Sequence, residues 1–331
     1  MKVTLQACSG RHPAARAGAP DALRALSLDV GAGDQIAVIG PSGAGKTTLL
    51  HLLACALPPS AGALALDDRD PWTLPRAELH RLRGSLFLAP QVPPLPPRQR
   101  VVTAVLAGRL PHIGLWHSLR CLFYPSAIAM ADAALARFDL SDKLFERVDR
   151  LSGGERQRVG LARALVALEA SRSAGPPQAR PAPEGLRPAA PSLPAQAWTG
   201  RRAVASGEGT SSAAHAVASV GATFLFLVDE PLSALDPTRA TQALAALTQA
   251  ARERGATLVS TLHHVEMALA HFPRIIGLRE GELVFDLPAA QVTPERLRAL
   301  YAQHLDEMTG PAPEMTHSPA TVSPPAVMHC R

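Results

Sequence analysis

The chain has 331 residues, of which 47% are hydrophobic and 4% aromatic, and its formal net charge is +5 at pH 7. This length fits one large or two ordinary domains, and the apolar fraction is sufficient for a sizeable core. The small, scattered excess of basic residues does not indicate nucleic-acid binding, so we expect no nucleic-acid partner. It is compatible with a protein that works beside an anionic membrane face.

The spacing of the cysteines and the lengths of the apolar runs indicate where in the cell the protein works. Four cysteines show neither C-x-x-C nor metal-ligand spacing, which is typical of reduced, isolated thiols in a cytosolic protein. The first residues lack the apolar core of a signal peptide, and no run approaches the ~18 uncharged apolar residues of a membrane helix. We therefore expect a soluble protein that would serve a membrane only as a peripheral subunit.

The N-terminal part of the chain predicts strands and then a phosphate-binding turn. Alternating apolar residues predict strands over Lys2–Ala7 and Ala22–Val30. A β-branched run from Ile36 to Ile39 then leads into a glycine-rich turn and a helix predicted over Thr47–Ala56. The sequence IAVIGPSGAGKTTLL satisfies the P-loop pattern G-x-x-x-x-G-K-[ST] in its expected strand–turn–helix context.

The residue types in this P-loop suit a nucleoside triphosphate. Glycines let backbone N–H groups wrap phosphate oxygens, and the helix directs its positive N-terminal end at the same phosphates. Lys46 supplies a charge for the β- and γ-phosphates, and the Thr47 hydroxyl can ligate Mg²⁺. We expect the following residues to contact the nucleotide: Gly40, Pro41, Ser42, Gly43, Ala44, Gly45, Lys46, Thr47 and Thr48.

The next segments predict alternating short elements and then a helical region. Those expected before the helical region are a strand over Ala63–Asp67, a helix over Pro75–Arg83 and a buried strand over Ser85–Ala89 that ends before Gln91. A proline-rich connection follows, and helices are predicted over Val101–Leu110 and Ser126–Phe138. Between these two helices the i, i+3, i+7 spacing of Trp116, Leu119 and Phe123 predicts a helix facing the core.

A Ser-Gly-Gly turn, Ser152 to Gly154, opens the next predicted helix, which runs to about Leu168. A glycine turn at a helix N-terminus is a second anion cradle, by the same physics as the P-loop. Residues Ser171 to about Gly221 are rich in proline and poor in large apolar side chains, so we expect a low-complexity, disordered insertion there. A regulatory or lipid-contacting role for it and a merely tolerated expansion are both open.

The apolar run before Asp229 and Glu230 predicts a strand buried on both faces, over Thr223–Val228. Its carboxyl end delivers two carboxylates to the sheet edge where phosphate binds. We expect Asp229 to hold Mg²⁺ and Glu230 to polarise the attacking water as a general base.

The rest of the chain predicts further strands and helices around one more candidate residue. The turn Pro231–Pro237 leads to a helix over Thr238–Arg252, and a strand over Ala256–Thr261 ends shortly before His263, a candidate sensor of the γ-phosphate. Elements predicted after it are a strand over Arg274–Leu278, a hairpin into Leu283–Phe285, a helix over Thr293–His304 and a disordered tail over 307–331.

Taken together, the motifs resemble ATP-binding cassette (ABC) ATPases. GPSGAGKT, Gln91, LSGGERQR, FLFLVDEP, SALD and His263 stand in that family's order. The resemblance implies an α/β fold: a RecA-like P-loop NTPase core with an N-terminal antiparallel β subdomain and a helical subdomain over about 93–163. The cassette domain would span 1–306.

The resemblance also implies a homodimer in which two chains sandwich ATP. Lys46, Thr47 and Thr48 of one copy would face Ser152, Gly153 and Gly154 of the other. Gln91 would sense Mg²⁺ and water, Glu230 would act as the base, and His263 would hold the γ-phosphate. Asp236 would contribute to the nucleotide site by signalling across the interface.

Two segments narrow the resemblance to phosphonate importer ATP-binding subunits: AGRLPHIGLWHSLRCLF and STLHHVEMALAHFPRIIGLREGELVFD. The implied function is ATP hydrolysis that drives uptake of phosphonate or a related phosphorus oxyanion. The implied setting is the cytoplasmic face of the inner membrane, with integral-membrane permease subunits and, through them, a periplasmic substrate-binding protein. The region of Trp116 would then dock the permease.

Three departures from the family pattern and two alternative functions stand beside this interpretation. The aromatic residue that usually stacks on adenine is not evident, His12 being the nearest ring; Glu155 replaces a common Gln; and the insertion lengthens the connection from Leu151 to Asp229. One alternative is the ATPase of a transporter for another substrate. The other is a permease-free ABC protein, either an accessory of phosphonate metabolism or a DNA-associated ATPase.

Overall fold

The computed structural model describes residues 1–12, 15, 18–114, 116, 118–120, 127–173 and 224–302. The strands are β1 Val3–Gly10, β2 Leu23–Val30, β3 Gln35–Ile39, β4 Ala61–Leu66, β5 Leu86–Ala89, β6 Leu225–Asp229, β7 Thr257–Thr261, β8 Arg274–Arg279 and β9 Glu282–Pro288. The α-helices are α1 Lys46–Leu53, α2 Arg76–Gly84, α3 Val101–Leu106, α5 Ile128–Ala136, α6 Gly153–Ser173, α7 Pro237–Arg254, α8 Val265–His271 and α9 Pro294–Leu300.

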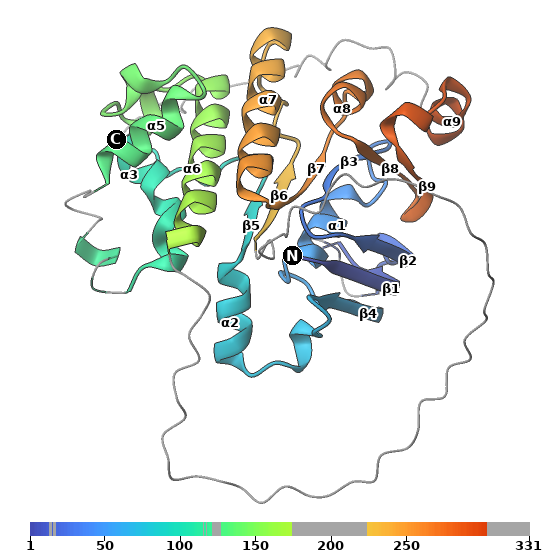
Figure 1. Cartoon of the computed structure of the whole chain (residues 1–331). Coiled ribbons are helices and arrows are strands. Elements are labelled where there is room, and N and C mark those ends of the chain that lie inside the picture. The colour runs from blue at the N-terminus through green and yellow to red at the C-terminus, as the bar shows by residue number, and fades with distance from the viewer. Residues whose placement is uncertain are drawn as a thin grey trace, which may run out of the picture.

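These strands form two sheets. The larger has the order β5-β6-β7-β3-β8-β9, parallel except for β9, which pairs antiparallel with β8 through the predicted hairpin. The smaller is antiparallel, with the order β2-β1-β4. Figure 1 shows the small sheet on one side of the molecule and α3, α5 and α6 on the other. The predicted α/β organisation with an N-terminal antiparallel β piece is confirmed.

The P-loop helix α1 lies in the apolar layer between the sheets. Its leucines Leu49, Leu50, Leu52 and Leu53 are fully buried, together with apolar residues of β1, β2, β3 and β4. Each buried leucine stabilises the fold by roughly 1.5–3 kcal/mol relative to an exposed one. The start of this helix, which carries Lys46, is therefore held in a fixed position.

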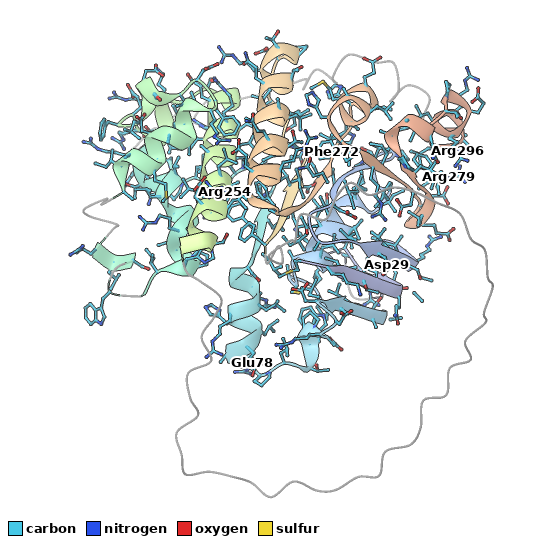
Figure 2. The ribbon with its side chains drawn as sticks, in the orientation of Figure 1. Asp29, Glu78, Arg254, Phe272, Arg279 and Arg296 are labelled. Atoms are coloured by element: carbon cyan, nitrogen blue, oxygen red, sulfur yellow. The ribbon has the colours of Figure 1, made fainter. Side chains whose placement is uncertain are left out.

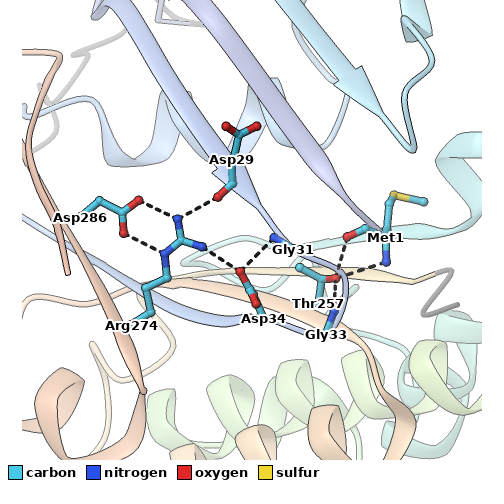
Figure 3. Close-up of polar contacts among 8 residues, drawn as sticks. All are labelled: Met1, Asp29, Gly31, Gly33, Asp34, Thr257, Arg274 and Asp286. Carbon is cyan, nitrogen blue, oxygen red and sulfur yellow. Dashed lines mark hydrogen bonds and ion pairs between the residues drawn. The ribbon is translucent and has the colours of Figure 1, made fainter. Parts of the chain in front are cut away.

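A polar network joins the two sheets (Figure 3). The guanidinium of Arg274 on β8 donates to both carboxylate oxygens of Asp286 on β9, at 2.8 and 2.6 Å, and to Asp34 at 2.7 Å. It also donates to the backbone carbonyl of Asp29 on β2, at 2.8 Å. The hydrogen bonds from Arg274 to Asp286, and the charges of Asp286 and Asp34, raise the pKa of Arg274 despite its partial burial. One side chain thus ties β2, β8, β9 and the turn before β3 together.

Helix α6 differs from the prediction in its length. It continues to Ser173, past the predicted end near Leu168 and past Ser171, where we expected the insertion to begin. Apolar residues as far as Ala170 remain buried, which explains the extension. The remainder of the predicted insertion and the predicted tail lie outside the described residues.

The other helix ends also differ from the predicted ones. Helix α3 ends at Leu106 and is followed by a 3₁₀ helix, η2, over Ala107–His112. At Gly108 the backbone approaches the carbonyl of Arg163 on α6 so closely that a Cβ would lie 2.3 Å from it. Helix α9 ends at Leu300 rather than His304.

The prediction that Trp116 faces the core was wrong. Its side chain is 85% exposed, and that of Leu119 is 49% exposed. The third member of the predicted stripe, Phe123, lies outside the described residues. Helical spacing of apolar residues identifies a common face, but it does not say whether that face meets the chain's own core or another surface.

Candidate functional site

The P-loop connects β3 to α1 through a turn that requires glycine. All five residues of β3 are buried, which aims its carboxyl end at the turn. At Gly40 a Cβ would lie 2.0 Å from the carbonyl oxygen of Leu278, and at Gly45, with φ +96°, it would lie 2.6 Å from that of Ala22. Neither position has room for a side chain, so β2 and β8 fix the path of the loop.

Lys46 is the first residue of α1 and is only 5% exposed. Its ammonium group donates to the carbonyls of Gly40, at 2.8 Å, and of Pro41, at 3.1 Å. The charge therefore lies inside the curve of the loop, where backbone N–H groups of a glycine-rich turn bind anions. Thr47 follows at the surface end of the helix, partly exposed, whereas Thr48 is buried.

The carboxyl end of β6 carries Asp229, which is 6% exposed. The neighbouring strand β7 ends at Thr261, directly opposite Asp229 in the parallel ladder. The Thr261 hydroxyl donates to Asp229 Oδ1 at 2.6 Å and accepts from the backbone N–H of Glu230 at 3.0 Å. One hydroxyl therefore orients both acidic residues.

Glu230 comes next, in a left-handed backbone conformation with φ +44°, and its carboxylate has two further partners. Gln91, just beyond the end of β5, donates through Nε2 to Glu230 Oε2 at 2.7 Å. His263, just beyond the end of β7, contacts Oε1 through Nε2. The three residues that we predicted to act on the γ-phosphate and its attacking water thus meet at one carboxylate.

The electrostatic surroundings keep Glu230 ionised. Burial raises the pKa of this carboxyl, but the hydrogen bond from His263 and the charges of His263 and Lys46 outweigh burial and hold the pKa below its usual value. A carboxylate that stays charged at neutral pH can accept a hydrogen bond from a water molecule.

Sequence reasoning missed two residues of this cluster, Thr261 and Gln157. Gln157 lies on α6 and is buried, and its Nε2 contacts the carbonyl of Glu230 at 3.4 Å. Thr261 could have been found, because a polar residue at the end of a predicted parallel strand must lie near the ends of neighbouring strands. Gln157 lies within the LSGGERQR motif that carries the family resemblance, but we predicted no role for it.

We expect Thr261→Val, which keeps the shape of the side chain, to lower the free energy of unfolding by about 1–3 kcal/mol. The reason is that a buried carboxylate oxygen and a backbone N–H would each lose a hydrogen-bond partner. Urea unfolding monitored by circular dichroism measures the change. Thr241→Val is the matched control, since this exposed hydroxyl bonds only within and beside α7, and it should change stability by less than about 0.5 kcal/mol.

The Ser-Gly-Gly turn forms the N-terminus of α6. The Ser152 hydroxyl accepts a hydrogen bond from the backbone N–H of Glu155 at 3.2 Å. In return, Glu155 Oε2 accepts a hydrogen bond from the backbone N–H of Ser152 at 2.8 Å. This reciprocal pair is a capping box, and it gives Glu155 a structural reason to be present. Ser152 and Gly153 are exposed, and Gly154 packs so closely on Ala234 that a Cβ would lie 2.8 Å from its carbonyl.

Asp236 caps helix α7. Its Oδ1 accepts from the backbone N–H of Arg239 at 3.0 Å, and Pro237 occupies the first helical position. The cap fixes the turn 230–236, which carries Ala234 against the Ser-Gly-Gly turn, Ser152 to Gly154, which we call the signature turn. Its predicted contribution to the nucleotide site stays a prediction.

The oxygen donors at this sheet edge suit Mg²⁺. Thr47 supplies a hydroxyl oxygen, and Asp229 supplies a carboxylate whose Oδ1 accepts a hydrogen bond from Thr261. Gln91 supplies the oxygen of its side-chain amide, and the nitrogen of the same amide donates to Glu230. In nucleotide sites, Mg²⁺ binds hard oxygen ligands of this kind, and phosphate oxygens and water complete its coordination. Across the described residues, no group of three His, Cys, Asp or Glu side chains forms an all-protein metal site.

The described helices include none that is both long and apolar enough to span a bilayer.

Comparison with known proteins agrees with this geometry. A family model described as ABC transporter matches residues 23–169. A dimeric ATP-binding cassette in a post-hydrolysis state, bound to ADP and Pi, superposes with a TM-score of 0.58 at 21% identity, covering 87% of this chain and 98% of that chain. A nucleotide-free ATP-binding cassette from an ABC transporter gives a TM-score of 0.59 at 17% identity, covering 94% and 100%. The fold and the site define an ABC-type ATPase of the P-loop NTPase class.

Two relatives match along their whole length. The phosphonates import ATP-binding protein PhnC of Polaromonas sp. is 66% identical over 331 residues, covering 100% of both chains. A second PhnC, from Albidiferax ferrireducens, is 59% identical over 331 residues with the same coverage. The chain belongs to the family of phosphonates import ATP-binding proteins, and the resemblance predicted from the sequence is confirmed.

Proposed function

We propose that this protein is the ATP-hydrolysing subunit of an importer for phosphonates or closely related phosphorus oxyanions. The observation that carries the substrate class is the full-length identity of 66% to a protein named for phosphonate import. The convergence of Gln91, Glu230 and His263 beside the P-loop supports the hydrolytic activity.

Each residue at the P-loop edge has a proposed role in hydrolysis. Lys46 and the backbone N–H groups of the loop bind the β- and γ-phosphates. Glu230 accepts a hydrogen bond from the attacking water and takes its proton, while His263 contacts the γ-phosphate and Gln91 orients the water. Mg²⁺, held by Thr47, Asp229 and Gln91, supplies positive charge that neutralises the phosphates.

The protein acts as a homodimer in this proposal. Ser152, Gly153 and Gly154 lie at the exposed start of α6, and in Figure 1 helix α7 and strand β6 lie between α6 and the P-loop helix α1. A signature turn from a second copy would cover the nucleotide instead. ATP then bridges two half-sites, and hydrolysis releases the bridge.

Exposed apolar side chains on the helical side support a membrane partner. Trp116 is 85% exposed, Val92 79%, Leu119 49% and Leu110 45%. Val92 directly follows Gln91, so a partner that covers it would contact the segment that reaches the catalytic carboxylate. We assign these exposed side chains to contacts with the permease subunits. In this proposal the protein works at the cytoplasmic face of the inner membrane, and the permease links it to a periplasmic substrate-binding protein.

Deleting the gene from its host should abolish growth on a phosphonate as the sole phosphorus source and leave growth on inorganic phosphate unchanged. The expected reason is that no other ATPase drives this permease. Growth curves and uptake of a radiolabelled phosphonate measure the effect. A plasmid-borne copy should restore uptake, whereas a copy with Glu230→Gln should not.

Normal phosphonate uptake in the deletion strain, together with ATP hydrolysis by the purified protein, would overturn the substrate assignment and leave the ATPase assignment intact.

A further inference from the structure

The segment that follows Gln91 runs along helix α6. We refer to residues 91–97 as the Gln91 strap. Gln91 at its start reaches Glu230, whereas Val92 is exposed and Leu95 is partly buried against the helical core. Four of the seven residues are prolines, so few backbone rotations are free and an anchor at one residue restricts its neighbours.

The first anchor is a close approach between Pro93 and Gly160. A Cβ on Gly160 would lie 2.5 Å from Cγ and 2.7 Å from Cβ of Pro93. The proline ring therefore rests directly on the backbone of α6, and any larger residue at 160 would push it away. Because the ring is part of the backbone, the displacement would move the strap itself.

The second anchor is Arg163, one turn further along α6. Its Nη1 donates to the backbone carbonyl of Pro94 at 3.2 Å. The guanidinium is partly buried, and this burial lowers the pKa of Arg163. Within the described residues, its Nε has no hydrogen-bond partner. Burying a charged side chain is costly unless it is hydrogen-bonded, so the bond to the Pro94 carbonyl is an important polar contact for Arg163.

A cavity of about 80 Å³ lies behind these contacts, lined by residues that include Pro90, Pro93, Gln157, Gly160, Arg163 and Asp229. The strap is thus not packed continuously against the end of β6. Its position depends on the two anchors, and Gln157 on the same helix already contacts the Glu230 carbonyl.

We propose that Gly160 and Arg163 are positioning residues for hydrolysis: through Pro93 and Pro94, helix α6 fixes where Gln91 lies relative to Glu230. Since α6 begins at the signature turn, a movement of Ser152 to Gly154 on a nucleotide would be carried along the helix to Gln91. This inference rests on the proposed role of Gln91 in hydrolysis.

The test is a kinetic cycle between positions 93 and 160 in the full-length protein. Gly160→Ala should lower kcat for ATP hydrolysis about 10- to 100-fold, because a shift of about 1 Å in a positioning contact has that effect. ATP affinity, measured with a fluorescent ATP analogue, should change less than twofold, since the P-loop is untouched. Pro93→Gly should lower kcat only a few-fold.

The double variant distinguishes positioning from general damage. Pro93→Gly removes the two atoms, Cγ and Cβ, that a Cβ at 160 would strike, and leaves only Cα at an ordinary contact distance of 4.0 Å. Gly160→Ala with Pro93→Gly should therefore return to the kcat of Pro93→Gly alone. Gly277→Ala is the matched control. It also introduces a methyl at a close approach, 2.6 Å from the ring of Phe285, but on β8 and away from α6 and the strap. It should lower the melting temperature, and Pro93→Gly should not rescue it.

Equal kcat for Gly160→Ala and the parent would overturn the inference, as would a double variant no faster than Gly160→Ala. If Gly160→Ala does not fold, Pro93→Gly decides, and an unchanged kcat there also overturns it. Gln91→Ala separates the two proposals. If this variant hydrolyses ATP at the parental rate, the proposed role of Gln91 in hydrolysis fails. If Gln91→Ala slows hydrolysis but Gly160→Ala does not, only the positioning role of α6 is rejected.

Discussion

Glu230→Gln is expected to lower the rate of ATP hydrolysis by about 10²–10⁴-fold, the range that general-base catalysis supplies. The amide keeps the size of the side chain and a hydrogen-bond acceptor, but it cannot take a proton from water. ATP binding should persist because Lys46 and the P-loop are intact. Size-exclusion chromatography with ATP should then show a stable dimer for the variant and a transient one for the parent.

The control for this prediction is Glu78→Gln. Glu78 lies in the first turn of α2, at the lower end of the molecule in Figure 2, and none of the residues of α2 is buried. The same chemical change there should leave hydrolysis unchanged. Hydrolysis at the parental rate by Glu230→Gln would instead show that another group is the base.

A second measurement on Glu230→Gln follows from the lowered pKa of Glu230. A carboxyl with a folded-state pKa below its unfolded value contributes stability above the unfolded pKa, and this contribution disappears as the pH falls through the folded pKa. The stability of the parent should therefore decline more steeply on acidification than that of the variant. Parallel slopes would mean that His263 and Lys46 do not stabilise the ionised form.

Lys46→Ala is expected to weaken ATP binding by about 10- to 100-fold, since charge-assisted hydrogen bonds contribute roughly 1.5–3 kcal/mol each. The ammonium group, held by the carbonyls of Gly40 and Pro41, is already inside the loop that receives the phosphates. Isothermal titration with a non-hydrolysable ATP analogue measures the loss.

Lys2→Ala serves as the control for lysine removal, because the exposed ammonium group of Lys2 pairs with Asp68 at 2.8 Å, just before β1. Its affinity for the analogue should match the parent. An undiminished affinity in Lys46→Ala would contradict the assignment of the P-loop as the phosphate site.

The two predictions differ in what they remove. Lys46 acts before chemistry, so its loss affects binding, whereas Glu230 acts on the water, so its loss affects turnover. Measured together, they separate the binding half of the site from the hydrolytic half.

Much of this site could be predicted from the sequence because its parts are local. The P-loop needs only adjacent glycines, Lys46 and Thr47, and the strand before Asp229 identifies itself by an unbroken apolar run. The ends of parallel strands meet at one edge, so Gln91, Glu230 and His263 could be expected near one another before any coordinates were known.

What the sequence did not predict depends on contacts between distant segments. The place of Thr261 at a strand end could have indicated it, but its bond to Asp229 requires that β7 lie beside β6. The close approach at Gly160 requires a proline from another segment, which no local pattern predicts. The exposure of Trp116 is of the same kind, since periodicity cannot distinguish a face that meets the chain's own core from one that meets another protein. The length of α6 exceeded the prediction because burial continues to Ala170.

Arg274 ties together two sheets that are built from different parts of the chain. By holding β2, β8, β9 and the turn before β3 with one guanidinium, it makes the small sheet and the P-loop a single body. Other contacts join helix α6 to the rest of the molecule: Gln157 reaches the carbonyl of Glu230, and Glu169 pairs with Arg254 on α7. Loss of the Arg274 guanidinium would therefore loosen the attachment of the small sheet to the large one and leave the contacts of α6 in place.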